Sequence, residues 1–216
     1  MSVTMKTVAF VPIRLNSKRV PGKNLKLLGG KPLLRHILET LTQVPELSEI
    51  YAYCSREDIM PLLPSGVSFL KREERLDDDL TKGAEIYDAF VHQVSADFYL
   101  LAHTTSPFIR PETVSEAIQK VQSGRYDSAL AVERVQTFTW YKGIPLNYAL
   151  NDVPRTQDIE PVFVETSAFF LFSRNTWLKQ RQRIGDLPYF AEVDRIEGID
   201  IDNPADFELA ERLVRK

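Results

Sequence analysis

Short apolar runs that alternate with helical patterns constrain the fold of this chain more than any other feature. The run V-A-F-V at residues 8–11 has the composition of a buried strand, and F-Y-L-L-A at residues 98–102 has it too. Strands that are apolar throughout are typical of parallel sheets covered on both faces, and parallel strands need crossover helices. The sequence therefore predicts an α/β fold: a three-layer α/β/α sandwich around a mainly parallel sheet.

Hydrophobic periodicity and turn residues give the boundaries of the expected elements. Expected strands cover residues 7–12, 49–55, 67–70, 97–102, 127–135, 163–172 and 189–193, and Asp200 and Asp202 lie on a last strand end. Expected helices cover residues 32–43, 57–63, 81–94, 111–121 and 175–183, and a last helix begins at Pro204. A proline in the first turn supports three of these helix starts.

Residues 136–162 interrupt this rhythm. The segment is rich in aromatic residues and proline, and it has no helical period. A stretch of this length without regular structure inside a compact domain is usually functional, and aromatic residues are enriched in subunit contacts. We expect one domain, residues 1–216, with residues 136–162 inserted as a dimerisation arm. The alternative is an insertion that packs into the core.

Composition narrows the class of protein and of partner. The 27 Lys and Arg against 30 Asp and Glu give a net charge of −3, which argues against a broad nucleic-acid surface. The single cysteine, Cys54, excludes an intrachain disulfide and fits a reducing compartment. No stretch approaches the apolar length of a membrane span, and the first residues lack a signal peptide. We expect a cytoplasmic protein without membrane or nucleic-acid partners.

A cationic loop follows the first expected strand. It holds Arg14, Lys18, Arg19 and Lys23, but Gly22 alone among glycines, so it is neither a Walker loop nor a dinucleotide-binding loop. Ligands of α/β sheets bind at the carboxyl ends of the strands, and Lys and Arg side chains are obligatory donors. The loop therefore predicts a phosphate-bearing ligand. The alternative is a charged surface loop.

Two further groups of residues have the chemistry of a binding site. On a strand, Asp200 and Asp202 would point to one face, where Mg²⁺ is the natural ion between two carboxylates. The alternative is that Asp202 or Asn203 caps the helix that follows. After the fourth expected strand, the segment H-T-T-S-P at residues 103–107 offers neutral donors and acceptors, and a histidine that could contact substrate or transfer a proton.

These motifs occur in an order that resembles the acylneuraminate cytidylyltransferase (CMP-sialic acid synthetase) family. The resemblance extends from Val8 to Val214 and depends mainly on R-x-x-S-K-R-x-P-G-K-N near the start and I-D-I-D-x-x-x-D-x-x-x-A-E near the end. T-S-P and P-R-x-Q support it. The related 3-deoxy-manno-octulosonate cytidylyltransferases share the fold and a similar opening loop.

The resemblance implies a CTP-dependent enzyme that transfers CMP to the anomeric hydroxyl of a 2-keto-3-deoxy sugar acid and releases pyrophosphate. It implies a homodimer, Mg²⁺ as cofactor, and Arg14, Lys23 and Asp200 as the catalytic residues. The nucleotide-binding residues that it implies are Arg14, Lys18, Lys23, Asn24 and Arg72, the last at the start of the charged run 71–80, which taken alone is typical of a solvated loop. The metal ligands would be Asp200 and Asp202. The sugar would be bound by His103, Thr105, Ser106, Arg155 and Gln157, with Arg155 reaching the pocket of the partner subunit.

The chain departs from the family pattern on the acceptor side. His103 replaces a glutamine that contacts the sugar, and Thr166 and Ser167 replace Asn-Gly. A third departure lies elsewhere, where Lys82 replaces a small residue near the nucleotide. The acceptor therefore stays open among N-acetylneuraminate, legionaminate, pseudaminate and octulosonates. Two other functions stay open as well: a GT-A-like glycosyltransferase, which also uses D-x-D with Mg²⁺, and a non-catalytic nucleotide-binding protein.

Overall fold

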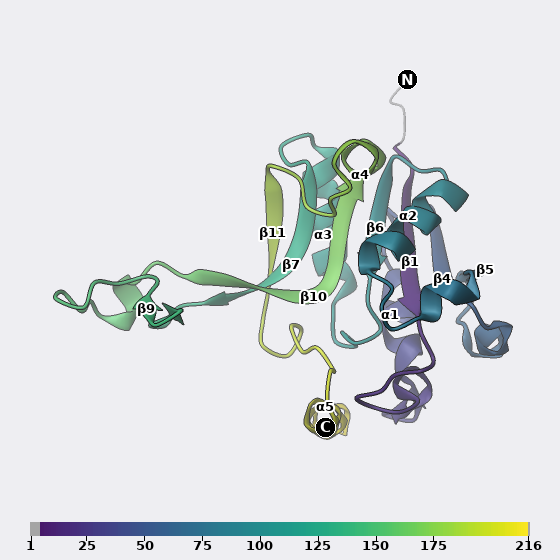
Figure 1. The fold of residues 1–216 in the computed structure, drawn as a ribbon, viewed down its shortest axis with the longest axis horizontal. Coiled ribbons are helices and arrows are strands. Elements are labelled where there is room, and N and C mark those ends of the chain that lie inside the picture. Colours follow the sequence, from purple (N-terminus) through teal and green to yellow (C-terminus); the bar gives the residue numbers. More distant parts are fainter. Residues whose placement is uncertain (1–4, 216) are drawn as a thin grey trace.

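The computed structural model describes residues 5–215 of the chain. The strands of its main sheet are β1 (Thr7–Ile13), β4 (Glu49–Cys54), β5 (Ser68–Lys71), β6 (Phe98–Ala102), β7 (Ser128–Val135), β10 (Val162–Ser173) and β11 (Pro188–Val193). They lie in the order β11-β7-β10-β6-β1-β4-β5 (Figure 1). Two hairpins lie outside this sheet, β2 (Leu27–Leu28) with β3 (Lys31–Pro32) and β8 (Trp140–Tyr141) with β9 (Ile144–Pro145).

The main sheet is parallel except at one strand. β1 pairs in parallel with both β4 and β6, β4 with β5, and β11 with β7. β10 runs antiparallel to both of its neighbours, β6 and β7, and its register shifts between Glu165 and Phe170. The expected mainly parallel α/β sheet is confirmed. Because β1 is flanked by parallel strands, its carboxyl end opens at the edge of the sheet where ligands of such folds bind.

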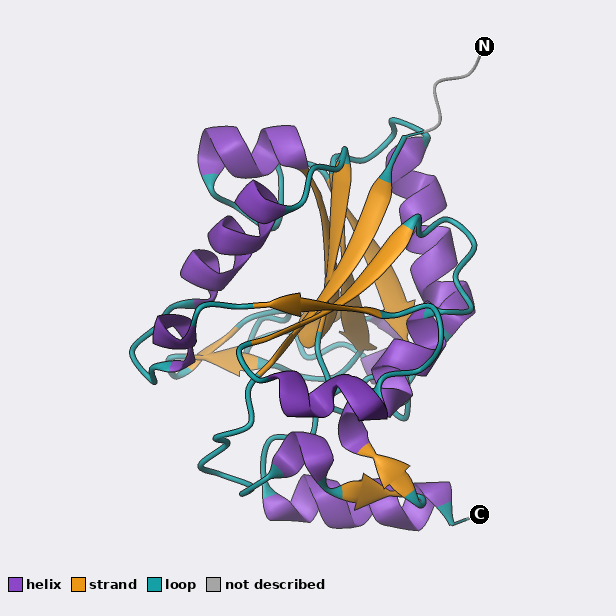
Figure 2. Cartoon of the chain, turned by 90° about the vertical axis from the view of Figure 1, so that its right-hand side faces the viewer, coloured by secondary structure: helices purple, strands orange, loops and turns teal. Residues whose placement is uncertain are grey.

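Residues 5–215 contain five α-helices, α1 (Leu33–Leu41), α2 (Gly83–Gln93), α3 (Pro111–Gln122), α4 (Arg174–Gln180) and α5 (Pro204–Val214), of which the first four cover the main sheet. Residues of α1 and α3 pack on one face of the sheet, whereas residues of α2 and α4 pack on the other (Figure 2). Alternate residues of β1 point into the two layers: Val11 joins the first core, and Phe10 stacks on Phe90 of α2 at 4.2 Å between ring centroids. The three-layer architecture is confirmed.

Most elements follow the sequence pattern, and the differences have local causes. Leu34, Ile37, Leu38 and Leu41 are completely buried, as their helical spacing predicts. Residues 57–62 form a 3₁₀ helix, η2, which contains Pro61. α4 ends three residues earlier than expected because Arg181 takes a left-handed conformation with φ of 54°. The β2–β3 hairpin was not expected, because two-residue strands leave no periodic signal.

One expectation is wrong. Asp200 and Asp202 do not lie on a strand: residues 199–202 form an irregular segment, tied to the rest of the protein by Ile201 N–H, which donates to Thr105 O at 2.8 Å. The proline at 204 and the cap at Asn203 stop the extended segment before it can pair further. Asn203 accepts hydrogen bonds from the backbone of Ala205 and Asp206, so Asn203, and not Asp202, caps α5.

Residues 136–161 project from the body of the protein between β7 and β10, as Figure 1 shows at the left. They contain the β8–β9 hairpin and the 3₁₀ helix η4 (Thr156–Asp158). Several large apolar side chains are exposed there, among them Trp140, Tyr141, Ile144 and Leu150. The segment therefore lies outside the core, and its role in a dimer stays a prediction.

The C-terminal helix docks on the β2–β3 hairpin. Ile201, Phe207 and Ala210 form a small separate core with Leu28 and Leu33. Gly29, in the turn of the hairpin, has φ of +58°, and a Cβ there would lie 2.1 Å from Cγ1 of Val214. The hairpin thus positions α5 and the acidic segment that precedes it.

Replacement of Gly29 by alanine should lower the free energy of unfolding by about 2–4 kcal/mol, because strain at positive φ adds to overpacking against α5. Gly30 is the matched control: its φ is +86°, but a Cβ added there would have nothing within 4 Å. Gly30→Ala should therefore cost about 1 kcal/mol, from the backbone strain alone. Urea unfolding of both variants tests this, and equal losses would contradict the proposed docking.

Candidate functional site

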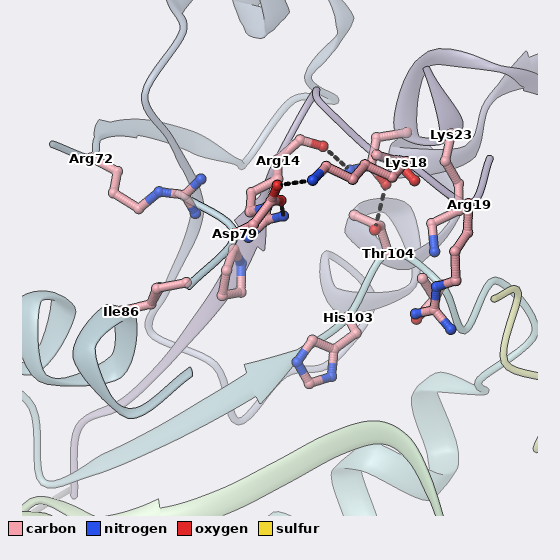
Figure 3. A pocket seen from close by; sticks show the side chains of 13 residues that line it. Arg14, Lys18, Arg19, Lys23, Arg72, Asp79, Ile86, His103 and Thr104 are labelled. Atoms are coloured by element: carbon pink, nitrogen blue, oxygen red, sulfur yellow. Dashed lines mark hydrogen bonds and ion pairs between the residues drawn. The ribbon is translucent and has the colours of Figure 1, made fainter. Parts of the chain in front are cut away.

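The loop after β1 lines a cavity of about 320 Å³ at the carboxyl end of the strand. Figure 3 shows cationic side chains gathered around it. Its walls come from the loop, from the segment after β5, from the first turn of α2 and from the segment after β6. The lining residues are Pro12, Arg14, Ser17, Lys18, Arg19, Lys23, Asn24, Arg72, Asp79, Ile86, His103, Thr104 and Thr105. All five residues that the sequence predicted for nucleotide binding are thus brought together.

Lys23 connects this loop to the far end of the chain. The positive φ of Gly22, 64°, starts the 3₁₀ helix η1 (Lys23–Leu25) and turns Lys23 inward. Lys23 Nζ donates to Ile201 O at 2.8 Å and lies 3.7 Å from Oδ1 of Asp202. Burial lowers the pKa of Lys23, and the charge of Asp202 opposes this effect. An ammonium has three N–H donors, and one of those of Lys23 is used by Ile201 O. The others are suited to bind an anion in the cavity.

Asn24 fixes the loop against two neighbouring segments. Its Nδ2 donates to Arg14 O at 2.6 Å, and its Oδ1 accepts from Thr104 Oγ1 at 2.6 Å. Each of the two amide atoms therefore has one protein partner, and the residue is buried. In this arrangement Asn24 holds the backbone of the cationic loop at a fixed distance from the end of β6.

Arg14 and Lys18 share one carboxylate. Arg14 Nη2 donates to Asp79 Oδ1 at 3.0 Å, and Lys18 Nζ forms an ion pair with Oδ2 of the same residue (Figure 3). Arg14 Nη1 also donates to Asp78 O at 3.3 Å. The ammonium of Lys18, followed by the charge of Arg14, lowers the pKa of Asp79. The carboxylate is therefore ionised at neutral pH and sits between the two cations.

Arg72 lies under the cavity and is completely buried. Its Nη2 donates to Ile13 O at 2.9 Å and pairs with Asp77, and Nη1 donates to Tyr53 O at 3.2 Å. The charged run 71–80 is thus not simply a solvated loop, because its second residue ties β1 and β4 together at their carboxyl ends. Arg72 Nε is buried and has no hydrogen-bond partner within residues 5–215.

His103 forms the other wall of the cavity. Its Nδ1 lies 2.5 Å from Ser167 O, and burial lowers the pKa of the ring. The imidazole is therefore neutral near pH 7, with Nδ1 as the donor to the carbonyl. Ser167 has φ of 61°, a left-handed conformation in the irregular part of β10 that turns its carbonyl toward the histidine. Thr105 lines the cavity, and Ser106 is completely buried with its Oγ unpartnered within the described chain.

The two acidic residues near the C-terminus have different surroundings. Asp202 accepts two hydrogen bonds from Arg19, at 2.9 and 3.0 Å. Oδ1 of Asp200 is buried and has no hydrogen-bond partner among the described residues. Burial raises the pKa of Asp200; a hydrogen bond from Thr105 opposes this effect, and the charge of Asp202 adds to it. An unpartnered buried carboxylate oxygen beside a second carboxylate is the donor set that a hard divalent cation prefers.

Residues 5–215 contain no group of three or more His, Cys, Asp or Glu side chains that could hold a metal ion. Mg²⁺ does not need such a group, because it takes one or two carboxylates together with substrate phosphates and water. Asp200 and Asp202 therefore fit an ion that is bound jointly with a phosphate ligand. The binding of Mg²⁺ by Asp200 and Asp202 stays a prediction.

Arg155 and Gln157 do not lie at the cavity of their own chain. They are exposed on the projecting segment, where Arg155 Nε donates to Asp158 Oδ2 at 2.7 Å. Gln157 uses its backbone carbonyl to accept from Gln136 at 2.9 Å. The prediction that Arg155 reaches the pocket of a partner subunit needs a second copy of the chain and stays open.

Sequence reasoning missed Asp79, Thr104 and Ile86, all of which line the cavity. Thr104 lies inside the H-T-T-S-P motif, and its hydroxyl could have been included with that of Thr105. Asp79 is the last of three consecutive acidic residues, and no feature of the sequence distinguishes it from Asp77 and Asp78. Ile86 belongs to the apolar face of α2, whose first turn reaches the cavity.

The chain matches the cytidylyltransferase family over residues 8–216. It is 28% identical to the CMP-N,N'-diacetyllegionaminic acid synthase of Legionella pneumophila, over 97% of both chains. It is 24% identical to an N-acylneuraminate cytidylyltransferase of Streptococcus agalactiae over 94% of this chain, which spans only 52% of that relative.

Solved structures show the same fold. A CMP:2-keto-3-deoxy-manno-octonic acid synthetase, complexed with CTP, matches with a TM-score of 0.73 and 17% identity over 97% of this chain and 98% of its own. The 4-diphosphocytidyl-2C-methyl-D-erythritol synthase of Anaerococcus prevotii matches with a TM-score of 0.69 and 11% identity over 99% of this chain and 97% of its own.

Replacement of Asp200 by asparagine should raise the free energy of unfolding by about 1 kcal/mol at neutral pH without divalent cations, because it removes a charge that burial disfavours and whose Oδ1 has no hydrogen-bond partner among the described residues. The folded-state pKa of Asp200 is raised, so the charge costs stability only as the pH rises through that pKa. Below the ordinary aspartate pKa the two proteins should match. Urea unfolding between about pH 3 and pH 8, a range that includes the ordinary aspartate pKa, measures this.

Asp202→Asn is the matched control for Asp200→Asn. Asp202 is ion-paired with Arg19 and partly exposed, so its neutralisation should not stabilise the protein. A gain in Asp202→Asn equal to that in Asp200→Asn would show that general charge reduction, and not the burial of Asp200, is responsible.

Proposed function

Because the chain belongs to the cytidylyltransferase family, we propose that it transfers CMP from CTP to the anomeric hydroxyl of a 2-keto-3-deoxy sugar acid. One observation carries this proposal: the cations Arg14, Lys18 and Lys23 converge on a single cavity at the carboxyl end of β1. The sugar-acid acceptor is supported by the names of the relatives, which make CMP-legionaminic acid or activate N-acylneuraminate. A sialic-acid-like nonulosonate is the acceptor that we favour, and an octulosonate is the second candidate.

In this proposal the anomeric oxygen attacks the α-phosphorus of CTP, and pyrophosphate leaves. Phosphoryl-type transfer depends on positioning and charge neutralisation more than on covalent catalysis. Arg14 and Lys18 would bind the outer phosphates. Lys23, held rigidly by Ile201 O, would stabilise charge that develops during the transfer.

Mg²⁺ would be held by Asp200 and Asp202 together with the phosphates. When bound, it supplies positive charge that offsets the charge of the phosphate oxygens. The unpartnered Oδ1 of Asp200 supports this assignment. Arg19 now occupies Asp202 with two hydrogen bonds, so Asp202 would have to exchange this partner for the ion.

The acceptor would lie on the side of the cavity formed by His103 and Thr105. The ring of His103 donates through Nδ1 to Ser167 O, which leaves Nε2 as an acceptor that a sugar hydroxyl could use. Arg155 and Gln157 would complete this side from the projecting segment of a partner subunit in a homodimer.

None of the helices described between residues 5 and 215 is long and apolar enough to cross a membrane.

Two other functions were compatible with the sequence. In GT-A-like glycosyltransferases the D-x-D motif normally follows a middle strand, whereas here it precedes the last helix. The family match also disfavours that function. A non-catalytic nucleotide-binding protein would bind CTP without turnover. Release of pyrophosphate from CTP, dependent on an added sugar acid, is expected only of the cytidylyltransferase.

The purified protein should release pyrophosphate when it is given CTP, Mg²⁺ and at least one member of a panel of nonulosonates and octulosonates. Lys23→Ala should lower kcat/KM by about 10²-fold, as is typical for loss of a charge-stabilising donor. Lys26 is the control, because it is a nearby cation that packs on Phe207 and does not line the cavity. Silence with every acceptor, or normal kinetics in Lys23→Ala, would refute the assignment.

The projecting segment should form the subunit contact. Ile144→Asp places a charge on the β8–β9 hairpin, where residue 144 is 68% exposed, and should convert a dimer to a monomer. Leu178→Asp on α4 is a matched control, because Leu178 is also exposed but lies on the body of the protein. Light scattering after size exclusion measures the mass. A wild-type monomer, or an equal effect of both variants, would contradict this role.

A further inference from the structure

Asp79 contributes negative charge to a cavity that is otherwise cationic. Among the described residues that line the cavity, five are Lys or Arg and Asp79 is the only acid. Its backbone lies in the segment that follows the 3₁₀ helix η3 (Glu74–Asp77), more than sixty residues from the loop that it contacts. A carboxylate in this place opposes the binding of any phosphate ligand, so its presence there needs an explanation.

The two oxygens of Asp79 occupy two different cations. Oδ1 accepts from Arg14 at 3.0 Å, and Oδ2 pairs with Lys18. One anionic group therefore bridges the two cations, as one phosphate group of a bound nucleotide would. Carboxylate and phosphate oxygens compete for the same N–H donors.

The contacts of Asp79 are exchangeable, unlike those of its neighbour Asp77. The side chains of Lys18 and Asp79 are 78% and 41% exposed, and exposed ion pairs contribute little to stability. Asp77 instead pairs with Arg72, whose side chain is 0% exposed. The acidic segment is thus anchored at Asp77, while Asp79, two residues later, can leave its partners at low cost.

We propose that Asp79 holds the place of a phosphate group in the free protein and is displaced when a nucleoside triphosphate binds. Asp79 holds the side chains of Arg14 and Lys18 close together, although their like charges repel each other. By occupying both cations, it also lowers the affinity of the cavity for phosphate. Asp79 is in this sense a positioning residue that sets nucleotide affinity. This inference rests on the proposed function, because it takes the triphosphate of CTP as the ligand that displaces Asp79.

A second arrangement predicts the opposite effect. If Asp79 stayed in place and oriented Lys18 toward the bound triphosphate, its loss would weaken binding. The sign of the change in affinity therefore decides between displacement and support. A purely structural role would change stability and leave the affinity of the folded protein unaltered.

The test is the affinity of Asp79→Asn for inorganic tripolyphosphate and for CTP, each with Mg²⁺, measured by calorimetry. Two exposed ion pairs are lost and one repulsive charge is removed, so both ligands should bind about threefold to tenfold more tightly than to wild type. The gain should shrink as the salt concentration rises, because exposed charges are screened over about 8 Å at physiological ionic strength. In turnover, KM for CTP should fall more than kcat changes.

Asp58→Asn is the matched control, since Asp58 is exposed and pairs with Arg56 outside the cavity. It makes the same change in net charge and should bind both ligands as wild type does. Asp79→Ser is a second variant in case the asparagine variant does not fold. Unchanged or weaker binding by the folded Asp79 variants overturns the inference while the proposed function stands. Failure of the wild type to bind either ligand overturns both.

Discussion

One buried hydrogen bond joins the two ends of the chain and determines the geometry of the site. Lys23 Nζ donates to Ile201 O, 178 residues later, at 2.8 Å. A buried ammonium loses its hydration and needs acceptors, so the carbonyl and the nearby Asp202 hold both segments in register. Together with the docking of α5 against the β2–β3 hairpin, this contact holds the acidic segment beside the cationic loop.

The cations of the cavity are paired with groups of the protein, so a phosphate ligand would have to replace some of these partners. Arg14 and Lys18 share Asp79, Arg19 binds Asp202, and Arg72 is fixed by buried carbonyls. The exposed pairs can exchange a carboxylate for a phosphate oxygen, whereas the buried contacts stay. The result is a site whose backbone is rigid and whose outer charges are replaceable, which limits the cost of ordering on binding.

The acceptor side has a different character. There a neutral histidine, His103, is oriented by the carbonyl of Ser167, whose left-handed backbone belongs to the irregular part of β10. These are the positions at which the sequence departs from the family that it resembles. Because β10 also leads directly from the projecting segment, acceptor recognition and subunit contact would depend on the same strand.

Periodicity and composition were enough to predict the strands of the main sheet, the helices α1 to α5, the mainly parallel pairing and the cationic loop after β1, because periodicity records how each segment is buried. The expectation that Asp200 and Asp202 lie on a strand was wrong. The backbone N–H of Ile201 bonds to Thr105 O, and Pro204 begins α5 two residues after Asp202, so the segment is too short to pair as a strand. The burial of Arg72 and the bridge that Asp79 forms between Arg14 and Lys18 became evident only in the folded chain. Pairing between charges far apart in the chain depends on topology, and local patterns carry no record of it.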